Sequence, residues 1–168
     1  MEDARRGARE PAGDFDEARA AAIIGGLKGL QGATLPILHA LQAEFGYVDQ
    51  RAVPLIADAL NLSRAEIHGA VSFYHDFRSA PAGRHVLKIC RAEACQAMGV
   101  EKLVERLAFA HRLEPGATSA DGGLTIENVY CLGNCALSPA ALLDGEPVGR
   151  LDGAAIDTIV LKHTGARA

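Results

Sequence analysis

Four cysteines in two close pairs constrain this chain more than any other feature of its sequence. Cys90 and Cys95 have four residues between them, Cys131 and Cys135 have three, and 35 residues separate the two pairs. Each pair follows a segment with the composition of a β-strand, RHVLKIC at 84–90 and LTIENVY at 124–130. Because loops that leave the same end of neighbouring strands lie together, we expect the four thiols to converge at one edge of a sheet.

The oxidation state of these thiols depends on the cellular compartment. Residues 1–10 are rich in Arg, Asp and Glu and lack the apolar central region of a secretory signal. We therefore expect a cytoplasmic protein that begins with a flexible tail at residues 1–13. Glutathione and thioredoxin keep cytosolic thiols reduced, so metal binding or catalysis becomes the main question.

Four thiolates form a suitable ligand set for a 2Fe-2S cluster. They fill the terminal positions of two irons bridged by sulfide, and no other protein ligand is needed. Gly133 and Asn134 lie inside the second loop, where glycine lets backbone amides approach the cluster sulfurs. The spacing thus favours one 2Fe-2S cluster bound by four residues: Cys90, Cys95, Cys131 and Cys135.

Other interpretations of the cysteines stay open on spacing alone. A structural zinc site, in a module that only recruits partners, is the strongest rival, although its ligand pairs usually have CxxC spacing. A thioredoxin-type dithiol also needs CxxC, and unligated buried cysteines explain one or two residues rather than two pairs. A Rieske centre replaces two cysteines with histidines, and no histidine lies near either pair.

Composition and charge exclude several classes of function. The formal charge of -4 comes from 21 acidic and 17 basic residues without a basic block, so nucleic acid is a poor candidate partner. No apolar run approaches the ~18 residues of a membrane span, so we expect no direct membrane insertion. The chain has no GxGxxG or Walker motif and thus no nucleotide site of its own.

The first half of the chain has the pattern of a small helical bundle, which we place at residues 14–80. Aspartates 14 and 16 can cap an Ala-rich helix that extends to Leu30, and a second helix is expected to begin at Thr34 and to end at Gly46. A third helix is expected at about 51–60. Ser63 and Glu66 form a capping box at the start of a fourth, at 64–74.

The second half, residues 81–168, has the pattern of a separate α/β domain. Pro81 and Gly83 mark the boundary, because helical periodicity stops there. Beyond it we expect a strand, a helix at 100–113, a second strand, a hairpin around Asp144-Gly145 and a last helix capped by Asp152. The fold class is therefore α/β, a small sheet with helices packed on it.

Two further groups of residues have alternative interpretations. Arg91 and Arg150 would favour a reduced, more anionic cluster if they lay beside it, whereas a solvated surface position is the alternative. The aromatic residues Phe73, Tyr74 and Phe77 are at helical spacing, which is more typical of a core than of a docking surface.

Several motifs resemble one known family. CRAEAC (90–95), CLGNC (131–135) and the following Ser138-Pro139 resemble the thioredoxin-like 2Fe-2S ferredoxin family, represented by the small flavin-associated subunit of respiratory complex I. GYVDQRAV (46–53), AVSFYHDF (70–77) and PAGRHVLKIC (81–90) extend the resemblance upstream. The resemblance implies a helical bundle followed by a thioredoxin-like domain, with the four cysteines matching the cluster ligands one by one.

The chain differs from the complex I subunits at residues that follow the first and the last cysteine. It has Ala92-Glu93 and Ser138-Pro139 where those subunits usually carry Gly-Thr and Ala-Pro. CRAEACQ and CALSPA resemble instead the gamma subunit of soluble, molybdenum-containing, NAD-dependent formate dehydrogenases, with subunits of NAD-reducing hydrogenases next. This resemblance implies an electron-transfer subunit without catalytic residues, an FMN- and NAD-binding flavoprotein partner and a molybdenum-containing catalytic subunit.

Overall fold

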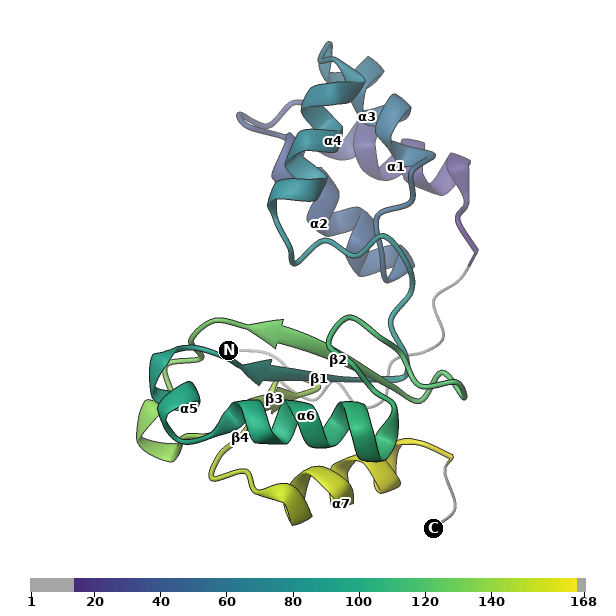
Figure 1. The fold of residues 1–168 in the computed structure, drawn as a ribbon. Coiled ribbons are helices and arrows are strands. Elements are labelled where there is room, and N and C mark those ends of the chain that lie inside the picture. Colours follow the sequence, from purple (N-terminus) through teal and green to yellow (C-terminus); the bar gives the residue numbers. More distant parts are fainter. Residues whose placement is uncertain (1–13, 166–168) are drawn as a thin grey trace. The chain divides into compact units, whose positions relative to one another are not determined.

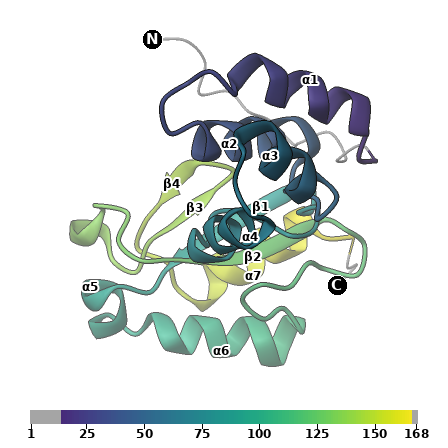
Figure 2. The same cartoon turned by 90° about the horizontal axis from the view of Figure 1, so that it is seen from above.

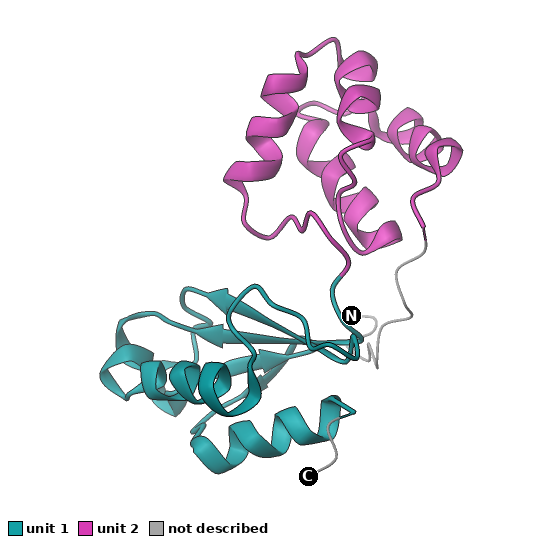
Figure 3. Cartoon of the chain, turned by 45° about the vertical axis from the view of Figure 1, so that its right-hand side comes forward, with its two compact units in different colours: residues 1–10, 82–168 teal, residues 11–81 magenta. Residues whose placement is uncertain are grey.

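The computed structural model describes residues 14–165, which form two compact units, one up to residue 81 and one from residue 82 onward (Figure 3). The tail expected at residues 1–13 lies outside the described residues. Within those residues, no helix has both the length and the apolar character needed to cross a membrane.

The first unit consists of helices, and local sequence signals mark the starts of the first and the fourth (Figure 1). The Asp16 side chain accepts a hydrogen bond from the amide of Arg19 at 3.0 Å, so Asp16 is the cap of the first helix. Ser63 and Glu66 form both hydrogen bonds of a capping box. The helices are α1 (Glu17–Leu27), α2 (Thr34–Phe45), α3 (Ala52–Leu60) and α4 (Arg64–Phe73).

Aliphatic residues from these helices form the core of the first unit. Full burial of one such side chain contributes about 1.5–3 kcal/mol. The largest of those buried completely are Ile37, Leu38, Leu41, Ile56 and Ile67.

The prediction that the aromatic stripe belongs to the core is wrong for two of its three residues. Phe73 is 73% exposed and Tyr74 is 44% exposed, while Phe77 is buried. Phe73 is the last residue of α4 and Tyr74 takes an extended conformation, so the three aromatic residues do not lie along one face of a helix. Phe73 and Tyr74 stack edge to face at the surface, with ring centroids 5.1 Å apart.

The second unit is a four-stranded mixed sheet with helices packed on it, which confirms the expected fold class (Figure 2). The strand order is β2-β1-β3-β4; β1 and β2 are parallel, and β3 is antiparallel to both β1 and β4. The elements are β1 (His85–Cys90), α5 (Glu93–Ala97), α6 (Val100–His111), β2 (Leu124–Val129), the 3-10 turn η1 (Cys135–Leu137), β3 (Ala141–Leu143), β4 (Glu146–Val148) and α7 (Gly153–His163).

The hairpin and the last helix form as the sequence predicts. Asp144 and Gly145 both have positive φ, 53° and 92°, which is the conformation of a tight type I′ turn between β3 and β4. The Asp152 side chain caps α7 by accepting a hydrogen bond from the amide of Ala155 at 2.8 Å.

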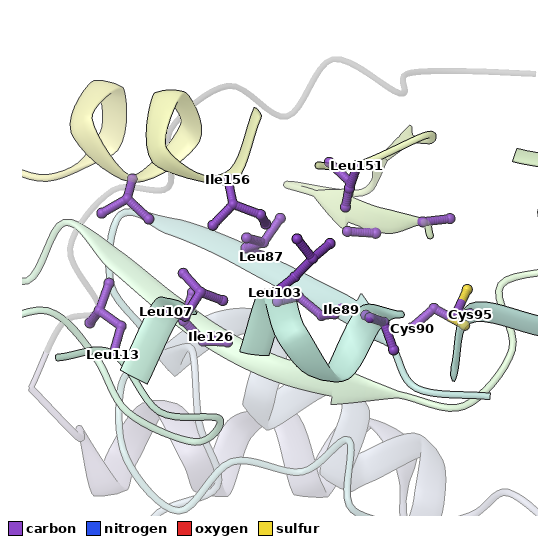
Figure 4. Packing of buried hydrophobic residues seen from close by; sticks show 14 of the residues in the cluster. Leu87, Ile89, Cys90, Cys95, Leu103, Leu107, Leu113, Ile126, Leu151 and Ile156 are labelled. Atoms are coloured by element: carbon purple, nitrogen blue, oxygen red, sulfur yellow. The ribbon is translucent and has the colours of Figure 1, made fainter. Parts of the chain in front are cut away.

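Side chains of the sheet and of α5, α6 and α7 form the core of the second unit (Figure 4). Leu87 and Ile89 of β1 pack with Leu107 of α6 and Ile156 of α7. Cys90 and Cys95 belong to the same buried cluster and lie together at one end of it in Figure 4. The core therefore supports the first cysteine pair directly.

Candidate metal centre

The parallel pairing of β1 and β2 places the two cysteine-containing loops at the same edge of the sheet. Cys90, the last residue of β1, is in register with Val129, the last residue of β2. The chain leaves β1 into α5, which carries Cys95, and leaves β2 directly into the loop of Cys131 and Cys135. Two cysteine pairs separated by 35 residues of sequence are thereby brought to one place.

The four thiols are free and arranged as two interacting pairs. The sulfur of Cys90 makes a hydrogen-bonding contact with that of Cys95, and the sulfur of Cys135 makes one with that of Cys131. Cys135 is also close enough to Cys90 and Cys95 to interact electrostatically with both. The first pair is buried, with Cys90 3% and Cys95 2% exposed, whereas the second pair is exposed.

The environment shifts the pKa of two thiols in opposite directions. The negative charge of the neighbouring Cys131 thiolate is the main cause that raises the pKa of Cys135. Burial alone would raise the pKa of Cys90, but hydrogen bonds from backbone amides and from the Cys95 thiol outweigh it, so the pKa of Cys90 is lowered. The site therefore already favours negative charge at its buried end.

Backbone amides at Cys90 come from both ligand loops. The amides of Ala92, Cys131 and Leu132 donate hydrogen bonds to the Cys90 sulfur. Two of these donors, the amides of Cys131 and Leu132, lie at the start of the second loop, just before Gly133. Such donors stabilise a thiolate and orient it for metal binding.

A left-handed residue stands at the start of the second loop. Cys131 has φ of 75°, which is rare for a residue with a side chain, and Gly133 has φ of 74°. Cys131 follows the end of β2 by two residues, and the amides of Cys131 and Leu132 donate to the Cys90 sulfur. No local sequence pattern predicts that a cysteine takes this left-handed backbone conformation.

The segment after Cys135 is fixed to the sheet by backbone hydrogen bonds. The carbonyl of Leu137 accepts from the amide of Arg150 at 2.6 Å, that of Pro139 from Leu151 at 3.0 Å, and that of Ala140 from Cys90 at 3.0 Å. These bonds tie the second ligand loop to the first.

Ser138 lies in this fixed segment, and its sequence context did not reveal its role at the site. Its Oγ is 3.5 Å from the sulfur of Cys95. The residue is 9% exposed and is one of two buried polar residues among those described.

Of the two arginines considered beside the site, Arg91 forms an ion pair. Its guanidinium donates to both carboxylate oxygens of Glu101, at 3.1 and 2.5 Å, and this contact raises its pKa. Its charge is therefore balanced by α6. Arg150 is exposed and contributes a backbone amide to Leu137.

The thiols fit a cluster with two metal ions. Within residues 14–165, no three or more Cys, His, Asp or Glu side chains are grouped so that they could hold one metal ion. A 2Fe-2S cluster requires two thiolates at each of two irons, and the number and pairing of the thiols match this donor set. Soft thiolate ligands and inward-facing amides suit an anionic iron-sulfide group.

Comparison with known proteins gives a consistent result. A family model described as thioredoxin-like [2Fe-2S] ferredoxin matches residues 20–164. The chain is 33% identical over 125 residues to a component of the NADH-quinone oxidoreductase of Pseudomonas aeruginosa, covering 73% of this chain and 75% of that component. It is 27% identical over 133 residues to HndA of the NADP-reducing hydrogenase of Solidesulfovibrio fructosivorans, covering 79% of this chain and 78% of HndA.

A solved structure is also similar. A chain of an NAD+-reducing [NiFe]-hydrogenase in the air-oxidized state aligns with 77% of this chain at a TM-score of 0.62 and 32% identity. This chain covers 22% of that hydrogenase chain, so most of the hydrogenase chain has no counterpart here.

Proposed function

Because the chain belongs to the thioredoxin-like [2Fe-2S] ferredoxin family, whose members bind a 2Fe-2S cluster, we propose that it is an electron-transfer subunit with one such cluster. The observation that carries the proposal is the arrangement of the four thiols as two neighbouring pairs at one edge of the sheet. The proposed ligands are Cys90, Cys95, Cys131 and Cys135.

Each part of the site has a separate task in this proposal. A bound 2Fe-2S cluster accepts and releases one electron at a time. The buried pair, Cys90 and Cys95, anchors it on the core and keeps water from that side. The exposed pair, Cys131 and Cys135, lies at the surface, where electrons enter or leave. The chain needs no catalytic residue of its own.

The proposed partner is a flavoprotein subunit that binds FMN and NAD. The names of the three relatives support it, since each refers to NADH, NADP or NAD+. Clusters of the plant ferredoxin type have potentials of about -400 mV, low enough to exchange electrons with a reduced flavin. We place the assembly in the cytoplasm, where the ligand thiols remain reduced before the cluster is built.

For the parent complex, we propose an NAD-dependent formate dehydrogenase with a molybdenum-containing subunit. The segments CRAEACQ and CALSPA support this assignment. The hydrogenase and NADH-quinone oxidoreductase relatives support the alternatives, in which the same subunit serves one of those enzymes.

Purification of the intact assembly tests both the proposed electron-transfer function and the proposed parent complex. The tagged chain, isolated anaerobically from its own source, is expected to bring a flavoprotein and a molybdenum protein with it and to reduce NAD with formate. A preparation that contains nickel and reduces NAD with hydrogen, but not with formate, would replace the formate assignment with a hydrogenase. A colourless chain with stoichiometric zinc would overturn the electron-transfer function itself.

A further inference from the structure

The hydroxyl group of Ser138 has two partners, and both belong to proposed cluster ligands. Ser138 Oγ donates a hydrogen bond to the carbonyl oxygen of Cys135 at 2.8 Å. It also accepts one from the thiol of Cys95, with the sulfur 3.5 Å away. One buried hydroxyl thus connects a residue of each cysteine pair.

This arrangement holds only while Cys95 keeps its proton. A metal-bound cysteine is a thiolate, which has no proton to donate. The Ser138 oxygen and the Cys95 sulfur would then face each other as two acceptors unless the hydroxyl rotates. A hydroxyl hydrogen is free to rotate, and hydrogen bonds to a charged acceptor are about twice as strong as those between neutral groups.

The carbonyl of Cys135 does not need the hydroxyl as its donor. The amide of Ser138 also donates to this carbonyl oxygen, at 3.2 Å. When the hydroxyl turns toward Cys95, the carbonyl therefore keeps a partner, and no buried polar group is left unpaired.

The position of Ser138 is fixed on both sides. The Leu137 and Pro139 carbonyls, adjacent to it in the chain, accept amides from Arg150 and Leu151, and the Ala140 carbonyl accepts from Cys90. Ser138 and Cys95 are both buried, so water is poorly placed to replace either partner. The donor is thus held in place before the cluster gains an electron.

We propose that Ser138 is a positioning residue that donates an O–H···S hydrogen bond to the Cys95 thiolate and thereby raises the reduction potential of the cluster. The inference rests on the proposed function. Adding one electron increases the negative charge on the ligand sulfurs, so a donor at Cys95 stabilises the reduced form more than the oxidised form. Hydrogen bonds to the sulfurs are among the factors that set the potential of iron-sulfur clusters.

The test is a potentiometric titration of the cluster in the full chain, followed by EPR with dithionite as reductant. We expect Ser138→Ala to lower the equilibrium constant for reduction about three- to tenfold, which corresponds to a potential about 28–59 mV more negative at 59 mV per tenfold. Ser72→Ala is the matched control, because Ser72 Oγ donates to the His68 carbonyl in α4 and does not touch a cysteine. This variant should keep the wild-type potential.

A second pair of variants separates the hydroxyl from packing. Thr and Val have nearly the same shape, so Ser138→Thr and Ser138→Val differ mainly in the hydroxyl. We expect the potential of S138T to lie close to wild type and that of S138V to match S138A. Equal potentials in S138T and S138V, or an unchanged potential in S138A, would overturn the proposal.

Failure to load the cluster also has a defined meaning. If S138A and S138V lose the cluster while S138T keeps it, the hydroxyl holds the site together rather than tuning it, and the proposal is overturned. If the wild-type chain itself binds no iron-sulfur cluster, the proposed function fails instead, so the two failures are distinguishable.

Discussion

The backbone amide of Cys131 donates a hydrogen bond to the sulfur of Cys90, although two helices and a strand lie between them in the sequence. The contact follows from the parallel register of β1 and β2 and from the left-handed conformation of Cys131. It joins the buried cysteine pair to the exposed pair and defines the edge of the sheet at which the cluster is proposed to bind.

Removal of either cysteine in this contact should abolish cluster binding. We expect Cys90→Ala and Cys131→Ala each to reduce bound iron from about two per chain to near zero, because an iron loses a thiolate ligand in each variant. Iron analysis and visible absorption measure the loss. Met98→Ala is the control, since Met98 is exposed directly after α5 and this variant should retain all its iron. Full iron content in either cysteine variant would remove that residue from the ligand set.

Gly149 is packed tightly against the segment that follows the second ligand loop. A Cβ at this position would lie 2.5 Å from Leu137 Cβ and 2.9 Å from the Leu137 carbonyl oxygen. We expect Gly149→Ala to displace the segment after Cys135, to destabilise the chain by about 1–3 kcal/mol and to accelerate cluster loss. Denaturant unfolding and the decay of visible absorption measure both effects.

Gly69 provides the comparison for this variant. A Cβ there meets no atom within 4 Å, and the residue lies inside α4. Gly69→Ala should leave the cluster unchanged and stabilise the helical unit by about 0.5–1 kcal/mol. Equal rates of cluster loss in the two variants would argue against a packed ligand loop.

Asp121 should make stability depend on pH. It accepts hydrogen bonds from Ser119 Oγ at 2.6 Å and from the amides of Gly165 and Gly123 at 2.6 and 3.1 Å. These bonds, chiefly the one from Ser119, lower its pKa to about 2 from an ordinary value of 3.8. Because the folded pKa is lower than the unfolded one, the stabilisation is complete above pH ~4 and is lost as the pH falls toward 2.

The matching experiment uses Asp121→Asn. We expect this variant to be less stable than wild type in urea at pH 7 and the difference to narrow as the pH is lowered from about 5 to about 3. Asp58→Asn, which changes an exposed carboxylate on α3, is the control. A difference that stays constant over this range would show that the charge of Asp121 is not the source of its contribution.

The proposed division into a helical bundle at 14–80 and a cluster domain at 81–168 can be tested through a helix cap. Ser63→Ala removes the capping box of α4 and should cost about 0.5–2 kcal/mol. If the units are separate domains, the cost appears in the unfolding of the helices, while the cluster absorption and its rate of loss stay as in wild type. Cluster loss that follows the unfolding of the helices would contradict the division.

Local sequence signals predicted most of the helices and strands. The caps at Asp16, Ser63 and Asp152 and the turn at Asp144-Gly145 act through neighbouring residues, so each can be recognised without the fold. The helix α5 has five residues and no side-chain cap, and a segment this short has little helical tendency on its own. Tertiary packing therefore decides its conformation.

The place at which the four cysteines meet could be predicted from the sequence, but the contacts within it could not. Cysteine spacing and strand composition led to the shared edge of the sheet. The left-handed conformation of Cys131 and the contact between Ser138 and Cys95 depend on how two distant loops meet. No pattern within either loop reveals such contacts, since they are set by the register of β1 and β2 and by the bonds that fix residues 137–140.

The most direct test of the central claim is the cofactor content of the chain purified without oxygen. We predict a brown protein with about two iron and two acid-labile sulfide per chain, whose visible absorption bleaches with dithionite. A colourless protein that contains stoichiometric zinc, and stays colourless after iron-sulfur reconstitution is attempted, would contradict the account and leave a structural interaction module.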